Sequence, residues 1–279
     1  NALIKDLKRQ KDALPEYELY LAMTGDIVVC GQDYVSYNSF KKEFDDKLNE
    51  IGLTKEHRMI VPGNHDIDRT SINKDFDQYK ERMDGCLESE REFNDFFSNK
   101  EYRDDKFDNY CLFESDFAKF GIDYSRNGKG WILNDNLGVY CLNTSLSSFG
   151  GINEIDDKKR LGVFTRGIVD WCNDLQTASN ILLMHHPLSD LIQWGKEALR
   201  QLIENNFALC LCGHNHEQDV FFNKISNKSL VCQAPQVFTS KSDLLGYGIV
   251  LVDDNSIDKI YYREYAKGQF FNGHSFSEN

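Results

Sequence analysis

Five of the seven histidines in this 279-residue chain lie in four short polar blocks that also hold aspartate and asparagine. The blocks are Gly25-Asp26, Gly63-Asn64-His65-Asp66, His185-His186-Pro187 and Gly213-His214-Asn215-His216. Imidazole, carboxylate and amide oxygen together form the ligand set that suits Mn²⁺, Fe or Zn²⁺ in proteins. The blocks therefore predict a metal site, provided that the fold brings them together.

An apolar run precedes each block, as expected of a buried strand. These runs span residues 21–24, 59–61, 181–184 and 209–212. Open α/β sheets bind ligands beyond the carboxyl ends of their strands, which is where all four blocks would lie. One block alone would be an ordinary turn or a structural histidine, but the recurrence of four favours a shared site.

The order of the blocks resembles that of the calcineurin-like metallophosphoesterases, from about residue 21 to residue 217. The resemblance implies an α/β fold, a two-sheet sandwich flanked by helices in the αββα manner. It also implies an enzyme, a dinuclear metal-dependent phosphoesterase whose two divalent ions supply hydroxide near neutral pH. We expect Mn²⁺, while Fe and Zn²⁺ also suit the ligands.

The resemblance implies metal-binding roles for five residues of this chain. Asp26 bridges the two ions, and Asn64, His185 and His214 complete the shell of the second ion. His216 binds the first ion together with Asp26. The family spacing of His-x-Pro selects His185, so the neighbouring His186 is the weaker candidate.

His65 and Asp66 are the catalytic candidates that the resemblance implies. His65 would lie beside the substrate and donate a proton to the leaving oxygen, and Asp66 would hold the other nitrogen of that imidazole. Asn64 and His65 would both contact the substrate. A turn-capping carboxylate is the alternative role for Asp66. Asn143 and Thr144 either add hydrogen bonds near the site or cap the next turn, and we assign them no chemistry.

One motif of the family is missing from this sequence. An earlier strand of the family carries Asp-x-His, which supplies two ligands of the first ion, and no such motif precedes Gly25. We therefore expect the chain to lack its first strand and to belong to a longer protein; a degenerate first metal position is the alternative. A fused or partner regulatory domain is compatible with that expectation.

The rest of the pattern fits one domain over residues 1–279. Apolar residues at helical spacing predict helices at residues 2–14, 34–50, 162–175 and 194–203. Strand-like runs predict strands at residues 131–133 and 139–145. After residue 217 we expect an antiparallel meander, followed by a polar tail around His274. Residues 69–127 are predicted to form a helical cap insertion. Its aromatic side chains are interleaved mainly with acidic residues, which favours self-packing over base stacking.

Composition narrows the classes of partner. A hydrophobic content of 41% is enough to form a large core. The net charge of −13 argues against nucleic-acid binding through the overall electrostatic field of the protein. Eight scattered cysteines without a CxxC pair indicate free thiols and a cytoplasmic location. No apolar run is long enough to span a membrane, so we expect no membrane association.

Two functions of different kinds follow from these features. We expect a phosphodiesterase that hydrolyses a nucleotide-type or nucleic-acid phosphodiester, including a DNA or RNA end, with metal-activated hydroxide. The alternative is a non-catalytic scaffold that binds a partner protein through the aromatic insertion. The intact His65 and Asp66 favour the enzyme, since a scaffold needs no proton donor.

Overall fold

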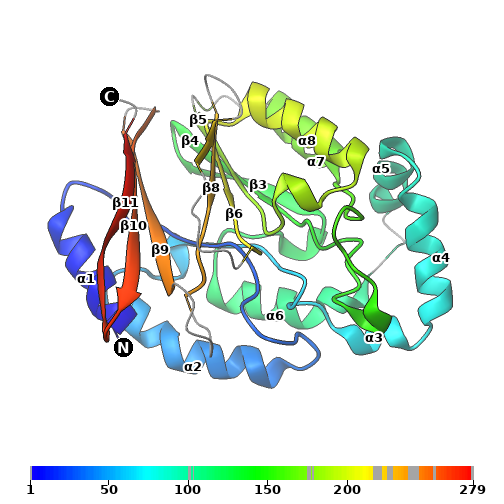
Figure 1. Ribbon diagram of the computed structural model, residues 1–279, viewed down its shortest axis with the longest axis horizontal. Coiled ribbons are helices and arrows are strands. Elements are labelled where there is room, and N and C mark those ends of the chain that lie inside the picture. Colours follow the sequence, from blue (N-terminus) through cyan, green and yellow to red (C-terminus); the bar gives the residue numbers. More distant parts are fainter. Residues whose placement is uncertain are drawn as a thin grey trace.

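Two layers of strands lie between helices in the computed structural model of the chain (Figure 1). The structure describes residues 2–99, 102, 104–174, 177, 179–215, 222–224, 229–237, 245–253 and 256–277. The layers and the flanking helices confirm the α/β sandwich that the sequence predicted.

Most elements form where the sequence predicted them, with the following bounds. The helices are α1 (Ala2–Ala13), α2 (Tyr34–Glu50), α3 (Arg69–Asn73), α4 (Phe76–Cys86), α5 (Glu90–Ser98), α6 (Asp108–Phe117), α7 (Thr165–Asp174) and α8 (Gln193–Asn206). The strands are β1 (Leu21–Met23), β2 (Arg58–Ile60), β3 (Gly128–Asn134), β4 (Leu137–Leu142), β5 (Ser179–Leu183), β6 (Leu209–Cys212), β7 (Phe222–Lys224), β8 (Leu230–Gln233), β9 (Leu245–Asp253), β10 (Ser256–Ala266) and β11 (Gln269–Ser277).

The larger layer is a six-stranded mixed sheet in the order β3-β4-β5-β6-β8-β7. The four central strands run parallel, and each edge strand is antiparallel to its neighbour. Side chains alternate between the two faces: Tyr140 and Leu142 pack with α7 and α8, whereas Val139 and Cys141 join the core between the layers. The carboxyl ends of β4, β5 and β6 therefore meet along one edge of the sheet.

The second layer consists of the parallel pair β1-β2 and the antiparallel sheet β11-β10-β9. The predicted meander is wrong for β8, which pairs in parallel with β6 inside the larger sheet. A short apolar strand has the same sequence pattern with a parallel or an antiparallel partner, so the pattern could not decide this. The end of the chain forms β11, a strand that the sequence did not predict, and His274 is exposed on it as expected.

Residues 69–127 carry α3 to α6, with one 3₁₀ turn before α6 (Asp105–Phe107) and another after it (Asp123–Ser125). Their aromatic rings face inward: Phe113 stacks on Phe117 and on Tyr37 of α2, with ring centroids 4.9 and 5.0 Å apart. None of the eleven aromatic side chains from Phe76 to Phe120 is exposed. Apart from Tyr124, which is 65% exposed, the insertion thus offers little aromatic surface to a partner, which weakens the scaffold alternative.

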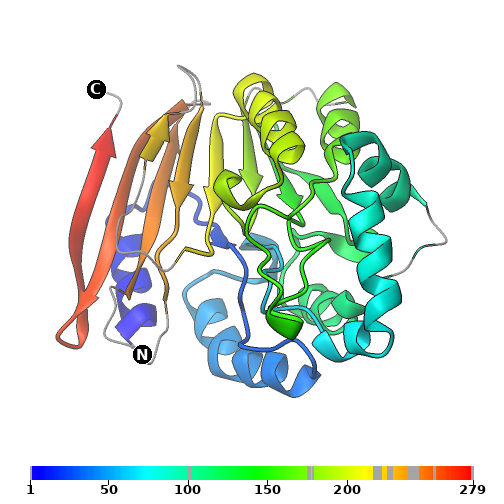
Figure 2. The same cartoon turned by 45° about the vertical axis from the view of Figure 1, so that its right-hand side comes forward.

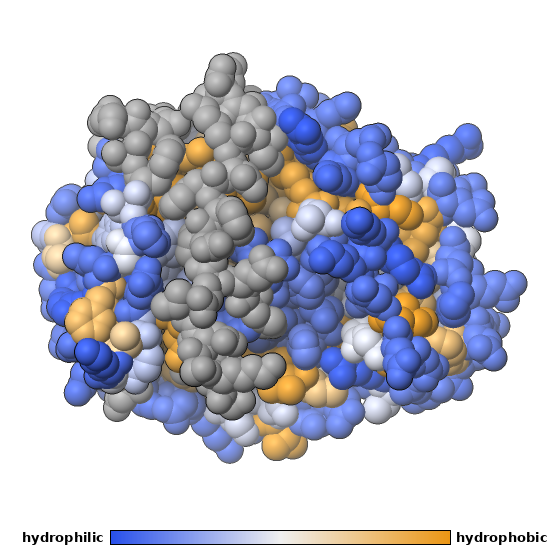
Figure 3. All heavy atoms as spheres, in the orientation of Figure 1, coloured by the Kyte–Doolittle hydropathy of each residue, from blue (hydrophilic) through white to orange (hydrophobic). Residues whose placement is uncertain are grey.

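The part of the surface over α4 and α5 is mainly hydrophilic on the face drawn in Figure 3, with small apolar areas between the charged side chains. Among the described helices, none has both the length and the apolar character needed to cross a membrane.

A buried ion pair joins the N-terminal helix to the C-terminal sheet, which lie side by side in Figures 1 and 2. The Asp6 carboxylate of α1 accepts hydrogen bonds from Arg263 Nε and Nη2 of β10, both at 2.8 Å. The Tyr247 hydroxyl of β9 donates a third at 2.6 Å. Burial by itself would raise the pKa of Asp6, but these donors hold the pKa below its usual value.

We expect Asp6→Ala to lower the free energy of unfolding by about 3 kcal/mol, because it leaves the Arg263 charge buried without its carboxylate. Urea unfolding measures the loss. The matched control is Lys47→Ala, which removes an exposed pair with Glu43 and should leave stability at the wild-type value. Equal effects of the two substitutions would contradict a structural role for the buried pair.

Candidate metal centre

The loops after β1 and β2 deliver Asp26 and Asn64 to the same place. Gly25 and Asp26 both have positive φ, +98° and +55°, which turns the chain sharply at the end of β1. Only glycine fits at position 63, because a Cβ there would overlap the Asp26 carboxylate and lie 2.6 Å from its backbone nitrogen. The backbone N–H of His65 donates to Asp26 Oδ1 at 3.0 Å, which fixes the side chain between the loops.

His185, at the end of β5, lies at the centre of the group. Its Nδ1 is 2.6 Å from the Thr24 carbonyl, so that nitrogen carries a proton and Nε2 presents a lone pair. Around Nε2 lie Asn64 Oδ1 at 3.2 Å, His214 Nδ1 at 3.2 Å and Asp26 Oδ2 at 3.4 Å. Four donor atoms from four different strand ends therefore converge.

These separations fit a shared cation. Two donor atoms bound at about 2.1 Å to one ion lie roughly 3.0–3.4 Å apart at octahedral to tetrahedral angles. The donor set, two imidazoles with one carboxylate and one amide oxygen, suits Mn²⁺, Fe or Zn²⁺. Asn64 Oδ1, His214 Nδ1 and Asp26 Oδ2 thus each lie at a distance from His185 Nε2 that suits two ligands of one ion.

The electrostatics of the centre also favour a cation. Burial by itself would raise the pKa of Asp26, but the facing His185 imidazole and the hydrogen bond from the His65 backbone N–H hold that pKa well below its usual value. Burial would lower the pKa of His185, but the Asp26 carboxylate and the Thr24 carbonyl raise it. The pocket therefore holds an ionised carboxylate that attracts positive charge.

Asp190 orients His214 from the opposite side. His214 has a positive φ of +70°, and its Nε2 lies 3.5 Å from Asp190 Oδ2. This contact directs Nδ1 toward His185, in the manner of the carboxylates that support metal-binding histidines. The sequence analysis missed Asp190, since it lies on a 3₁₀ turn (Leu188–Asp190) with no motif of its own.

Asp66 is buried and clamps the two loops together. Its carboxylate accepts the backbone N–H groups of Ile27 at 3.0 Å, Val28 at 3.2 Å and Gly63 at 2.9 Å. The Tyr37 hydroxyl donates to its main-chain carbonyl at 3.0 Å. Burial and the nearby Asp26 carboxylate raise the pKa of Asp66 to about 6.

The expected contact between Asp66 and the His65 imidazole is wrong. His65 Nδ1 instead donates to the Val29 carbonyl at 2.9 Å, because the Asp66 carboxylate is turned inward by the backbone donors. Asp66 thus matches the turn-capping alternative, extended across two loops. His65 is half-buried at the edge of the centre, and its Nε2 makes no hydrogen bond to any described residue.

The structure also brings His186 to the centre, although the sequence ranked it below His185. Ring nitrogens of His185, His186 and His214 lie within 4.8 Å of one another. Burial and the two neighbouring imidazoles hold the pKa of His186 well below its usual value. The predicted ligand His216 lies outside the described residues.

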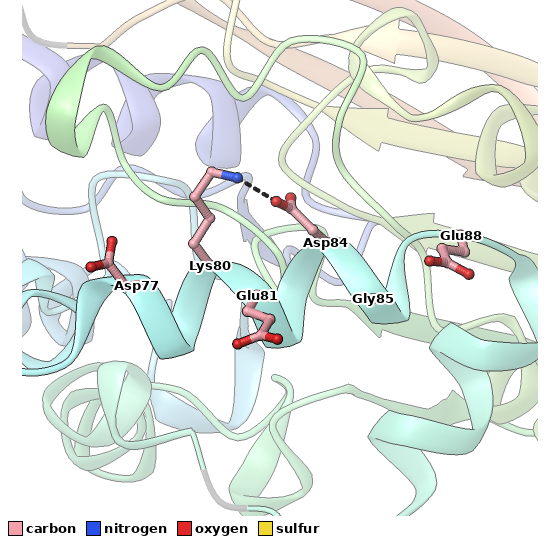
Figure 4. A pocket seen from close by; sticks show the side chains of 6 residues that line it. All are labelled: Asp77, Lys80, Glu81, Asp84, Gly85 and Glu88. Carbon is pink, nitrogen blue, oxygen red and sulfur yellow. Dashed lines mark hydrogen bonds and ion pairs between the residues drawn. The ribbon is translucent and has the colours of Figure 1, made fainter.

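A separate hollow runs along α4 and holds none of these residues. Its lining is Asp77, Lys80, Glu81, Asp84, Gly85 and Glu88 (Figure 4). Lys80 and Asp84 pair with each other one helical turn apart. These side chains form a solvated helix face, which by itself indicates no ligand.

The chain is similar to known proteins both in sequence and in fold. The family described as calcineurin-like phosphoesterase matches residues 1–218. Among solved structures, the crystal structure of a dimetal phosphatase from Danio rerio is similar, with a TM-score of 0.53 at 11% identity over 97% of this chain and 87% of that one. At this identity the likeness concerns the fold. A search of curated proteins found no match.

Gly63→Ala should weaken Mn²⁺ binding about 10- to 100-fold, because the added Cβ displaces the Asp26 carboxylate. Isothermal titration calorimetry measures the affinity. Gly85→Ala in α4 is the matched control, since a Cβ there meets nothing within 4 Å and the affinity should stay unchanged. Wild-type affinity in Gly63→Ala would show that Asp26 is not a ligand.

Asp190→Ala should also weaken Mn²⁺ binding, by about 10- to 100-fold, because His214 loses the group that orients its ring. Asp77→Ala, on the α4 hollow, is the control that removes a carboxylate elsewhere. The same calorimetric titration reports both variants. If they bind equally, Asp190 does not position His214.

Proposed function

The chain belongs to the calcineurin-like phosphoesterase family, and we propose on that premise that it hydrolyses phosphodiesters of the nucleotide type. Family membership makes it a metal-dependent phosphoesterase. The observation that carries the proposal is the convergence of Asp26, Asn64 and His214 on His185 Nε2 within 3.2 to 3.4 Å, with His65 at the edge.

The family implies two divalent ions, which lower the pKa of a bound water so that hydroxide is available near neutral pH. We assign Asp26 as the residue shared between the ions and Asn64, His185 and His214 as ligands of the second. We assign His216, outside the described residues, to the first. Mn²⁺ is the proposed metal, because the site mixes nitrogen with carboxylate and amide oxygens.

His65 is the proposed general acid. Its Nδ1–H is held by the Val29 carbonyl, which fixes the ring and leaves Nε2 for the substrate. In the protonated imidazole, Nε2–H can be transferred to the leaving oxygen as the phosphorus–oxygen bond breaks. Asn64, next in the chain, supplies an amide group that can contact a phosphoryl oxygen while Asp66 keeps both loops in place.

Charge favours a small substrate over a long polyanion. The net charge of −13 repels an extended nucleic acid, whereas a nucleotide-type diester carries little charge beyond the phosphate that enters the centre. A DNA or RNA end is the second substrate to test. Its binding would weaken steeply with added salt, unlike that of a small diester.

The proposal also includes the cellular compartment of the protein and the domain organisation of the chain. All eight cysteines are unpaired thiols, which supports a reducing compartment such as the cytoplasm. We assign residues 1–279 to one catalytic domain whose helical insertion covers residues 69–127. A fused or partner regulatory domain is compatible with this arrangement.

His65→Gln should lower kcat on a dinucleotide diester, whose alkoxide leaving group needs a proton, about 10²- to 10⁴-fold at unchanged metal content, because it removes the proton donor but no ligand. Turnover of bis(p-nitrophenyl) phosphate, whose leaving group is a weak base, should change much less. Steady-state kinetics of the Mn²⁺-loaded protein and elemental analysis provide the two readouts. His57→Gln is the matched control, since His57 lies away from the centre beside Tyr20 and Glu18.

Two results would contradict the proposal. Faster turnover of p-nitrophenyl phosphate than of the diester would make the protein a phosphomonoesterase. Wild-type kcat in His65→Gln would remove His65 from the mechanism while leaving the metal-dependent hydrolysis intact.

A further inference from the structure

Arg69, the first residue of α3, carries a guanidinium group without a partner near the loop that holds Asn64. Every other arginine in the described part of the chain contacts a carboxylate or an aromatic ring. Arg69 makes no hydrogen bond, ion pair or ring contact with any described residue. In a chain of net charge −13, carboxylates outnumber cations, so a shortage of acidic partners does not explain this.

Only the inner part of the Arg69 guanidinium is enclosed. Nε is inaccessible to solvent and has no hydrogen-bond partner among the described residues. The residue as a whole is partly exposed, and its two terminal nitrogens are not enclosed. The side chain therefore presents N–H donors to solvent from a stem that is held by packing.

Gly150, in the loop after β4, leaves the space that this side chain occupies. A Cβ on Gly150 would lie 3.0 Å from Arg69 Nε and 3.0 Å from the carbonyl oxygen of Asn64, so no more than twice that distance separates these two atoms. Gly150 has a φ of +61°, and its N–H donates to Ser148 Oγ and Asp157 Oδ2, both at 3.1 Å. The turn that makes room for the guanidinium is therefore itself fixed.

The position and the charge of Arg69 suit an anion bound at the centre. Asn64 is the proposed metal ligand that also contacts a phosphoryl oxygen, so it links the guanidinium to the place where a phosphate would bind. A guanidinium binds two phosphate oxygens at once through parallel N–H donors, and it remains charged at neutral pH. The excess negative charge of the protein repels an anionic substrate, and a fixed cation offsets that repulsion locally.

We propose that the terminal nitrogens of Arg69 bind a phosphate group of the substrate. The proposal rests on the phosphoesterase function proposed above and adds a substrate-binding residue to it. The phosphate is either the scissile one or the terminal phosphate of a 5′-phosphorylated dinucleotide, because both offer the same pair of oxygens to the guanidinium.

The first test compares Arg69→Met with the wild-type protein on a dinucleotide diester that carries a 5′-phosphate. KM should rise about 10-fold while kcat and metal content keep their wild-type values, because a hydrogen bond to a charged group is lost from substrate binding alone. Arg82→Met is the matched control. It removes the same charge from an exposed arginine that lies over the Tyr79 ring on α4, and KM should stay unchanged.

Two further measurements identify which phosphate Arg69 binds. If it binds the scissile phosphate, Arg69→Met also raises KM for the dinucleotide without a 5′-phosphate and weakens the binding of inorganic phosphate to the Mn²⁺-loaded protein in isothermal titration calorimetry. If it binds the terminal phosphate, only the 5′-phosphorylated dinucleotide is affected. Either result supports the proposal.

Arg69→Lys keeps the proposal testable if Arg69→Met does not fold. Lysine retains the stem and the charge but cannot bind two oxygens in parallel, so KM for the 5′-phosphorylated dinucleotide should still rise, by less than 10-fold.

Other results would overturn the proposal. Unchanged KM in both Arg69 variants would exclude a contact with substrate, and loss of metal in Arg69→Met would show that the guanidinium supports the Asn64 loop instead. If the wild-type protein with its full metal content neither binds phosphate nor hydrolyses either dinucleotide, the proposed function itself fails together with this inference.

Discussion

The candidate centre depends on one buried carboxylate, that of Asp66. Its oxygens accept hydrogen bonds from the backbone N–H groups of Ile27 and Val28 in the loop after β1 and of Gly63 in the loop after β2. Without it, these N–H groups would be buried without acceptors, which costs about 1–3 kcal/mol each. Because Asp26 and Asn64 lie on these same loops, the Asp66 carboxylate sets the spacing of these two side chains.

The candidate centre also requires the backbones of these two loops to approach each other closely. The loops meet where side chains would collide: a Cβ on Gly25 would lie 2.7 Å from the nitrogen of Gly63, and Gly63 in turn lies against Asp26. Asp26 and His214 adopt positive φ, an uncommon backbone state for residues with a side chain. Such strain persists where the surrounding structure fixes it, as the network around Asp66 and His185 does here.

The insertion stabilises the centre from outside. Lys106 is fully buried, and its Nζ donates to the carbonyls of Leu146 at 2.7 Å and Ser148 at 3.0 Å. These carbonyls belong to the loop after β4 that begins with Asn143 and Thr144, so the insertion and the Thr144 hydroxyl beside His186 are part of one packed unit. Asn109 also donates to the Gly31 carbonyl at 3.0 Å, near the loop that holds His65.

The sequence by itself determined most strands and the polar blocks that end four of them, because apolar runs followed by Gly or Pro are local patterns. Those patterns placed Asp26, Asn64, His185 and His214 correctly at strand ends. Only the tertiary structure decided the partner of β8, the inward turn of Asp66 and the contacts of Asp190 and Thr144 with histidines. These depend on which distant donors and acceptors are buried together, and no local spacing encodes that.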